Sequence, residues 1–178
     1  NYNCETCKHN KEKCPGHNGN LKLNYPVINV LFVSEIRKWL KLICHTCGNL
    51  IMSLDNINKK PYLKTLLNNN KLTELIKIKI PKNTSEIKCD VCESYQPQIY
   101  ASKKIEKAEH KFIYTAKLYQ STGTGIKRDK ETKLVNEYLL YPHNFLEIFS
   151  RLPDEYLDAL DIDIQLHPKN YILTDILI

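Results

Sequence analysis

The sequence contains no apolar run long enough to cross a membrane. Its longest candidate, residues 25–33, falls well short of the roughly 20 residues that a spanning helix requires, and Asn29 interrupts it. No secretory signal opens the chain, and no internal repeat of fixed period recurs along it. We therefore expect an intracellular protein with no membrane partner.

The chain also lacks an initiator methionine. It begins at Asn1, directly before a cysteine motif, and stops at the apolar residues 176–178. We therefore expect a fragment of a longer protein. Its 178 residues suit one domain, and a hydrophobic share of 42% is enough for a modest core.

Seven cysteines are present, and without a secretory signal they argue against a disulfide framework. Their spacing indicates metal binding instead. Zn²⁺ takes four soft or borderline ligands in a tetrahedron, and two ligands separated by two residues can hold one ion from a tight turn. Every cysteine belongs to such a pair: Cys4 with Cys7, Cys14 with His17, Cys44 with Cys47, and Cys89 with Cys92.

Loop length predicts which pairs share an ion. Closing a short loop loses less entropy than closing a long one, and six residues separate Cys7 from Cys14. We therefore predict two structural zinc ions, the first bound by the ligands before residue 20 and the second by the four later cysteines. An interleaved pairing, as in RING domains, is the alternative. Both predicted sites have four protein ligands, so neither leaves a position for an activated water.

The spacing also selects the histidine ligand. The segment Cys14-Pro15-Gly16-His17 has knuckle spacing, and Gly16 permits a tight backbone turn. His9 and His45 are expected to be solvated. The remaining histidines have no metal-ligand context and are expected on the surface or in ordinary packing: His110, His143 and His167.

The formal net charge of +6 is unevenly distributed. Residues 1–134 hold 24 basic and 12 acidic side chains, whereas residues 135–178 hold 2 and 8. The first three quarters of the chain could therefore face a polyanion such as nucleic acid. The candidate contacts lie on a predicted helix and a predicted hairpin tip: Arg37, Lys38, Lys41, Lys127, Arg128 and Lys130. A solvated polar face explains any single one of them equally well.

Hydrophobic periodicity predicts an α+β fold of short elements. Helices are predicted at 31–43, at 142–152, from 153 onward, and as one or two short helices within 61–76, interrupted at 68–70. Strands are predicted at 21–25, ended by Pro26, and at 98–102. A long hairpin over 110–119 and 133–141 turns at 121–125. Residues 48–60 are a predicted loop, and 171–178 a buried strand or extended exit.

We divide the chain into four segments of one module. Residues 1–60 hold the first zinc knuckle, a strand, a helix and half of the second zinc site, and residues 61–100 hold a helical insertion and the other half. Residues 101–141 form the hairpin, and residues 142–178 a helical exit segment.

The order of these motifs resembles a known family. Cys4-Glu5-Thr6-Cys7, then Cys14-Pro15-Gly16-His17-Asn18-Gly19, a strand and Pro26-Val27 are similar to the start of the clamp in the largest subunit of multisubunit DNA-directed RNA polymerase. A helix, a Cys pair, a variable insertion and a further Cys pair follow in the family's order. Residues 139–149 and 168–174 resemble the family's exit from this region. Residues 31–40 resemble the version in large DNA viruses of the African swine fever virus type.

Two departures from the cellular pattern accompany this resemblance. Asn18 stands where cellular enzymes usually carry Phe, and the pair at Cys89 is more compact than in some of them. The family's Asp-rich catalytic loop is absent, since residues 161–163 offer two aspartates without the third or the glycine. Residues 123–127 are no P-loop, because the spacing and the following Ser or Thr are missing. We expect no catalytic residue in this chain.

The resemblance implies a small zinc-stabilised clamp module that closes over template DNA and the RNA–DNA hybrid. The whole enzyme would be a nucleotidyltransferase, with Mg²⁺ bound only in the remainder of the subunit. The implied partners are other polymerase subunits, especially the second-largest. A viral enzyme would lie in the virion and the host cytoplasm, and a cellular one in the nucleus.

Two other classes of protein share these motifs. A free-standing zinc-ribbon regulator that binds DNA or RNA predicts a reading frame that ends near Ile178. A RING-type ubiquitin ligase predicts the interleaved pairing of ligands.

Overall fold

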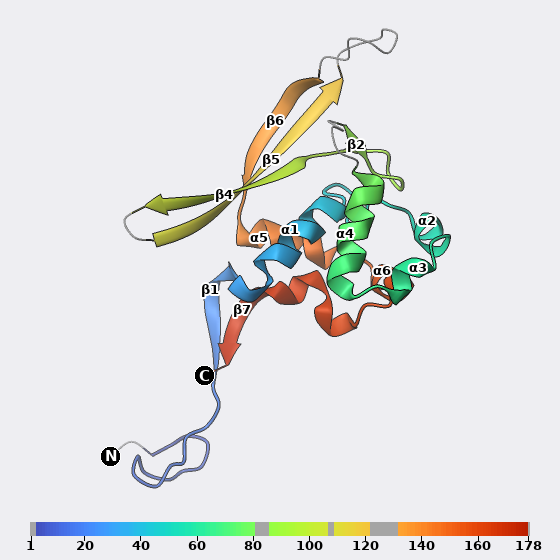
Figure 1. Cartoon of the computed structure of the whole chain (residues 1–178). Coiled ribbons are helices and arrows are strands. Elements are labelled where there is room, and N and C mark those ends of the chain that lie inside the picture. The colour runs from blue at the N-terminus through green and yellow to red at the C-terminus, as the bar shows by residue number, and fades with distance from the viewer. Residues whose placement is uncertain (1–2, 81–85, 107–108, 122–131, 178) are drawn as a thin grey trace.

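The computed structural model describes residues 3–80, 86–106, 109–121 and 132–177. Short helices form a central body, with a three-stranded sheet extending from one side and a strand pair leading to an N-terminal loop segment on the other (Figure 1). Small antiparallel sheets alongside helices confirm the predicted α+β class. Among the described residues, no helix has the length and apolar character that a membrane span requires.

The amphipathic helix α1 (Val33–Leu42) lies at the centre of the body. Its side chains at helical spacing, Ile36, Trp39 and Leu40, are almost completely buried. A 3₁₀ turn, η1 (Val30–Phe32), leads into the helix. Helix α4 (Asn68–Lys79), helix α5 (Pro142–Ser150) and strand β4 (Gln98–Glu106) pack against it. The predicted helices at 31–43 and 142–152 are therefore confirmed.

The aromatic core joins α5 to the sheet and to the end of the chain. Phe145 is fully buried, and Tyr114 meets it edge-on with ring centroids 5.0 Å apart. Phe32 stacks on Tyr171 at 4.4 Å. Helix α6 (Glu155–Leu160) follows α5, as predicted, and two 3₁₀ turns, η2 (Ile164–Leu166) and η3 (Pro168–Tyr171), lead into the last strand.

A two-stranded ribbon connects the body to the N-terminal segment. Strand β1 (Asn20–Ile28) pairs antiparallel with β7 (Ile172–Leu177), which places the strand that follows the N-terminal loop segment beside the last strand of the chain (Figure 1). The prediction that Pro26 ends the first strand is wrong. The pairing register shifts between Lys22 and Val27, so Pro26 lies in an irregular stretch where no ladder hydrogen bond is required of it. Strand β7 is exposed from Thr174 onward, as an extended exit would be.

The predicted hairpin is confirmed as β5 (Glu109–Ser121) paired with β6 (Thr132–Leu140). The expected strand at 98–102 extends to Glu106 as β4 and makes a third strand beside β5. Lys117 lies opposite Glu137 and forms an ion pair with it at 3.0 Å. The predicted turn beyond Ser121, with Lys127, Arg128 and Lys130, lies outside the described residues.

Two predictions in the insertion are wrong in detail. The predicted loop at 48–60 contains helix α2 (Leu54–Asn58), because Ser53 caps it by accepting a hydrogen bond from Asn56 N at 3.4 Å. Helix α3 (Tyr62–Thr65) and α4 are separated at 66–67 and not at 68–70, since Leu67 is extended and α4 begins at Asn68. Two short strands, β2 (Ile87–Lys88) and β3 (Tyr95–Gln96), then pair with each other.

His167 is a packing residue with its ring only 1% exposed. Its Nδ1 accepts a hydrogen bond from Lys169 N at 3.2 Å, and its Nε2 lies 3.3 Å from the Leu152 carbonyl oxygen. This arrangement requires the neutral ring, because a protonated Nδ1 could not accept. Burial lowers the pKa of His167 below its ordinary value of about 6.5.

We expect the free energy of unfolding to fall as pH is lowered through about 6.5, because the unfolded chain then binds a proton that the folded chain excludes. Above that pH the contribution is constant. Asn at this position keeps an acceptor for Lys169 N and does not titrate. His167→Asn should therefore make the free energy of unfolding depend less steeply on pH below about 6.5. Urea unfolding across this pH range tests it, and an unchanged slope in the variant would assign the pH dependence to other groups.

Candidate metal centres

Three of the four predicted pairs fold into the same tight turn. In each, the N–H of the first cysteine donates to the carbonyl five residues on, and its own carbonyl accepts from the N–H four residues on. For Cys44 these bonds are 2.7 and 2.9 Å long. The residue four positions after the cysteine has positive φ in every case: Lys8, Gly48 and Glu93. The repeated turn places both cysteines of a pair to face one ion.

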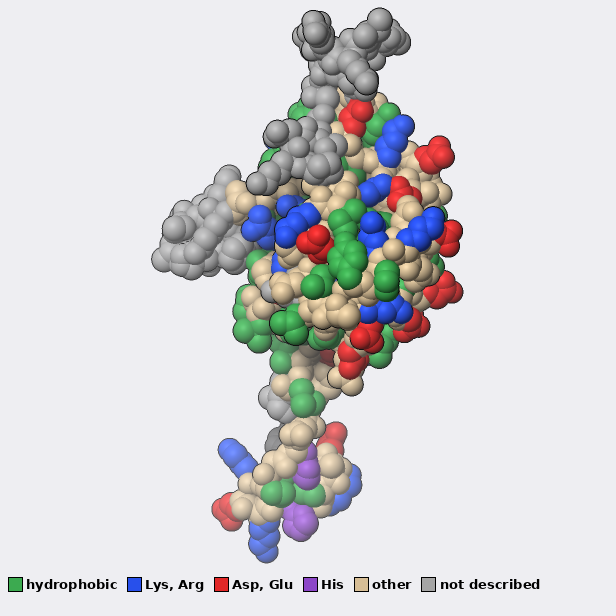
Figure 2. Space-filling model, turned by 45° about the vertical axis from the view of Figure 1, so that its right-hand side comes forward, with side chains coloured by type: hydrophobic (Ala, Val, Ile, Leu, Met, Phe, Trp, Pro, Cys, Tyr) green, Lys and Arg blue, Asp and Glu red, His purple; other side chains and the backbone are tan. Residues whose placement is uncertain are grey.

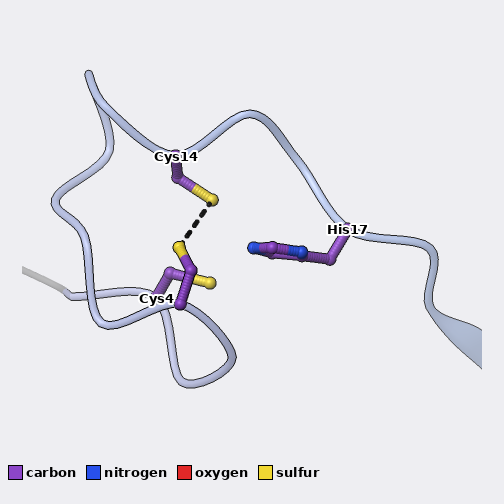
Figure 3. A group of neighbouring side chains, drawn as sticks. Cys4, Cys14 and His17 are labelled. Atoms are coloured by element: carbon purple, nitrogen blue, oxygen red, sulfur yellow. Dashed lines mark hydrogen bonds between the residues drawn. The ribbon is translucent and has the colours of Figure 1, made fainter.

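The first group lies in the loop segment that precedes β1. Ligand atoms of Cys4, Cys7, Cys14 and His17 lie within 4.8 Å of one another. Figure 3 shows Cys4, Cys14 and His17 directed toward a common point from different parts of the loop. Gly16, between the last two ligands, has a φ of +86°. Backbone hydrogen bonds from Cys7 and Thr6 lower the pKa of the Cys4 thiol to about 6.

The second group is built into the body. Cys44 and Cys47 follow the end of α1, and Cys89 and Cys92 lie between β2 and β3. Their sulfur atoms also lie within 4.8 Å of one another, and Cys44 and Cys89 are buried. The structure thus brings together the two sets of four that the sequential pairing predicts, and the described residues show no interleaved set.

The sulfur separations fit a tetrahedral ion. A Zn–S bond of about 2.3 Å places two sulfur ligands of a tetrahedron about 3.8 Å apart. The observed Sγ–Sγ distances are 3.7 Å for Cys7 and Cys14, 3.6 Å for Cys44 and Cys92, and 3.8 Å for Cys47 and Cys89. A disulfide would require about 2.05 Å. The donor set therefore suits a soft, tetrahedral dication.

The thiol pKa values of the second group require such a cation if all four cysteines are to ionise. Burial raises the pKa of Cys44 to about 12, whereas the hydrogen bond with Ser94 lowers that of Cys92 to about 6. A bound dication offsets the repulsion between adjacent thiolates and the loss of their hydration.

Asp90 anchors the second group to the body, and sequence reasoning missed it. Its carboxylate forms an ion pair with Lys79 and accepts from Asn56 Nδ2 at 3.1 Å and from Ser53 N at 3.4 Å. Burial opposes ionisation of Asp90, but the bonds from Lys79 and Asn56 outweigh it and hold the pKa below its usual range. The only sequence signal is an acid inside a Cys-x-x-Cys turn.

Of the predicted nucleic-acid contacts, three lie on described residues of α1. Arg37 is exposed, and Lys38 and Lys41 are half-buried. Burial and the neighbouring charge of Arg37 lower the pKa of Lys41. Neither Arg37 nor Lys41 has an ion pair or side-chain hydrogen bond to another residue in the described ranges.

None of the other histidines whose side chains are described belongs to either group of ligand atoms. His9 is exposed, as expected, and His143 is exposed and stacks on Tyr141. The prediction that His45 is solvated is wrong. It is half-buried, with Nε2 3.2 Å from the Leu40 carbonyl oxygen and Nδ1 3.3 Å from Tyr138 Oη, because its turn packs under β6. The side chain of His110 lies outside the described residues.

Known proteins similar to this chain are polymerase subunits. The model of the family "RNA polymerase Rpb1, domain 1" matches residues 1–178. The chain is 30% identical over 96% of its length to a probable DNA-directed RNA polymerase II subunit RPB1 homolog of Invertebrate iridescent virus 6. It is 31% identical over 97% of its length to a DNA-directed RNA polymerase RPB1 homolog of African swine fever virus. An archaeal subunit Rpo1N from Methanothermobacter thermautotrophicus is 32% identical over 63% of the chain.

These matches confirm the resemblance that the cysteine motifs indicated. The chain spans 16% of the iridescent virus relative, 10% of the African swine fever virus relative and 13% of the archaeal one. Because the family model covers every residue from 1 to 178, the chain belongs to the RNA polymerase Rpb1 domain 1 family.

Proposed function

We propose that this chain is the zinc-stabilised clamp region of the largest subunit of a viral-type DNA-directed RNA polymerase. The observation that carries the proposal is the family match over the whole chain, together with two four-ligand groups in the order that the motifs predict. Relatives that share 30% and 31% identity over nearly all of this chain are viral. Those relatives are much longer than this chain, which argues against a free-standing regulator. The ligand groups follow one another in sequence and are not interleaved, which argues against a RING-type ligase.

The proposed role is to hold template DNA and the RNA–DNA hybrid while the remainder of the enzyme transfers nucleotides. That remainder would carry the Mg²⁺ site, and the second-largest subunit would be a principal partner. Bound zinc would fix irregular loops without a large core, so that a small lobe stays rigid as the clamp moves. The four segments 1–60, 61–100, 101–141 and 142–178 would act as one module. The enzyme would work in the virion and the host cytoplasm.

The basic residues of α1 are the proposed contacts with nucleic-acid phosphates. Figure 2 shows Lys and Arg side chains spread over the body, with acidic side chains gathered toward one edge. Arg37 and Lys41 lie one helical turn apart, and the repulsion between them would be relieved by a phosphate. Lys38 lies beside them, and Lys127 and Arg128 remain proposed contacts in the hairpin.

Charge reversal tests this surface. We expect Arg37→Glu with Lys41→Glu to weaken duplex binding uniformly across sequences and to lower the slope of log affinity against log salt by about 2. Lys59→Glu with Lys64→Glu reverses two exposed basic charges in the insertion, away from α1, and serves as the matched control. An unchanged salt slope in the double variant would remove α1 from the proposed nucleic-acid surface.

Metal content tests the ligand sets. We expect native mass spectrometry to find two zinc ions per chain, because the four ligand atoms of each group lie within 4.8 Å of one another. Cys14→Ser should release one ion and leave the other, since the first group lies in a separate lobe (Figure 2). Loss of both ions from this variant would instead indicate coupled sites and contradict the pairing.

The complete reading frame tests the polymerase assignment. We expect it to continue beyond Ile178 for several hundred residues to an Asp-rich motif that binds Mg²⁺. A frame without such a motif would contradict the assignment and favour a separate zinc-binding regulator.

A further inference from the structure

The two ligand groups differ in the net charge that they would leave on a bound zinc ion and in how deeply they are buried. Three thiolates and a neutral histidine leave a zinc ion with a net charge of about −1, whereas four thiolates leave about −2. The second group is also the more buried of the two. Burying an uncompensated charge is unfavourable, so the second group needs donors directed at its sulfur atoms.

Such donors surround the second group. Backbone N–H groups of Cys47 and Val91 lie 3.4 Å from the sulfur atoms of Cys44 and Cys89. Asn49 Nδ2 lies 3.4 Å from Cys47 Sγ. Ser94 Oγ lies 3.3 Å from Cys92 Sγ and can donate to it once Cys92 is a thiolate. Every sulfur of the group therefore has a partner outside the ligand set or in the turn itself.

Gln96 makes the shortest of these contacts and is 4% exposed. Its Nε2 donates to Cys44 Sγ at 3.1 Å and to the Ser94 carbonyl oxygen at 3.0 Å, while its Oε1 accepts from His45 N at 2.9 Å. The orientation of the amide is fixed, because a backbone N–H can only donate and must therefore face the oxygen. The nitrogen is left facing the sulfur.

The position of Gln96 in the chain matters as much as its contacts. It lies on β3, in the hairpin that carries Cys89 and Cys92, yet it bonds to Cys44 and His45 in the knuckle that follows α1. One side chain thus joins the two halves of the second group, which 41 residues of chain separate.

We propose that Gln96 is the positioning residue of the second metal site. Its amide orients Cys44 and offsets part of the negative charge on that sulfur, so that the four-sulfur site retains its ion. The proposal rests on the metal-binding part of the proposed function. Hydrogen bonds from outside the ligand set typically change metal affinity by about 10- to 100-fold.

Cobalt is the probe for this role. The experiment uses Co²⁺ in a Cys14→Ser background, so that the absorption comes from the second site. We expect Gln96→Met to bind Co²⁺ about 10- to 100-fold more weakly than the background chain. We also expect its thiolate-to-cobalt charge-transfer bands to move to longer wavelength, because a sulfur freed from its hydrogen bond gives up electron density more readily.

Two further variants separate positioning from packing. Gln96→Glu keeps an oxygen for His45 N but replaces the donor to Cys44 with a second oxygen, so it should bind Co²⁺ at least as weakly as Gln96→Met. Gln98→Met alters the neighbouring glutamine, which accepts from Tyr100 Oη at 2.7 Å, and should leave spectrum and affinity unchanged. If the background chain takes up no Co²⁺, the metal-binding proposal itself fails. If it does, and both Gln96 variants match it, the role of Gln96 alone is wrong.

Discussion

Replacing Cys44 with serine is expected to unfold the body of the chain, whereas replacing Cys14 should leave the body folded. Cys44 is fully buried and follows directly on α1, which carries the centre of the core. It also packs with Ile51 and Ile87 in a small cluster of buried residues around the second group. Losing this ligand would release the ends of the insertion that contains α2, α3 and α4.

The size of the stability loss expected for Cys44→Ser follows from the binding free energy of structural zinc sites. Their binding free energy is about 10–16 kcal/mol in zinc-finger peptides, which is as large as the whole stability of a typical domain, about 5–15 kcal/mol. The first group, in contrast, lies beyond β1, and none of its ligands belongs to either cluster of buried residues. Its loss should disorder the loop segment alone.

Far-UV circular dichroism on heating in the presence of zinc measures both effects. We expect Cys44→Ser to lack a cooperative transition. Cys14→Ser should unfold at a temperature close to that of the parent chain. A cooperative melt of Cys44→Ser at the parent temperature would mean that packing around α1 supports the body without the second ion. If both variants lost the cooperative transition to the same extent, the N-terminal lobe would be coupled to the core.

Local patterns predicted the parts of the fold that depend on neighbours in sequence. Cys-x-x-Cys spacing identified the turns because each turn closes on its own backbone, from Cys4 to His9 and from Cys44 to Asn49. The helical spacing of Ile36, Trp39 and Leu40 identified α1 because one face of that helix is buried.

The parts that were missed depend on contacts between distant segments. Strand β1 continues through Pro26 because β7, about 145 residues later, pairs with both sides of an irregular stretch. His45 is half-buried because β6 brings Tyr138 to it. Gln96 contacts Cys44 and His45 only after the hairpin of β2 and β3 meets the end of α1. Asp90 contacts Lys79 and Asn56 only after the same hairpin meets α4 and α2, so no pattern of neighbouring residues predicts either contact.

Gly48→Ala is the second change with a large expected effect, about 2–5 kcal/mol of destabilisation. Gly48 has a φ of +79°, a conformation that costs other residues about 1–2 kcal/mol. Lys8 and Glu93 adopt positive φ at the same position of the same turn, so the backbone conformation alone does not require glycine. The requirement comes from space, since a Cβ on Gly48 would lie 2.3 Å from Arg151 Cβ and 3.0 Å from the Arg151 carbonyl oxygen.

Relief of that clash would have to move α5 or the knuckle. Arg151 directly follows α5, whose Phe145 and Phe149 are fully buried, so neither the Cβ nor the carbonyl can shift alone. Overpacking of this kind adds about 1–3 kcal/mol to the backbone term. Gly16→Ala is the matched control, because Gly16 has a φ of +86° but no atom lies within 4 Å of its added Cβ.

Urea unfolding in the presence of zinc compares the two glycine variants. Gly48→Ala should lower the unfolding midpoint markedly, while Gly16→Ala should leave the transition of the body in place, since its strain falls on the N-terminal lobe. Equal midpoints would show that α5 yields easily at Arg151. A large difference would identify the approach of Gly48 to α5 as the contact that fixes the second metal knuckle against the aromatic core.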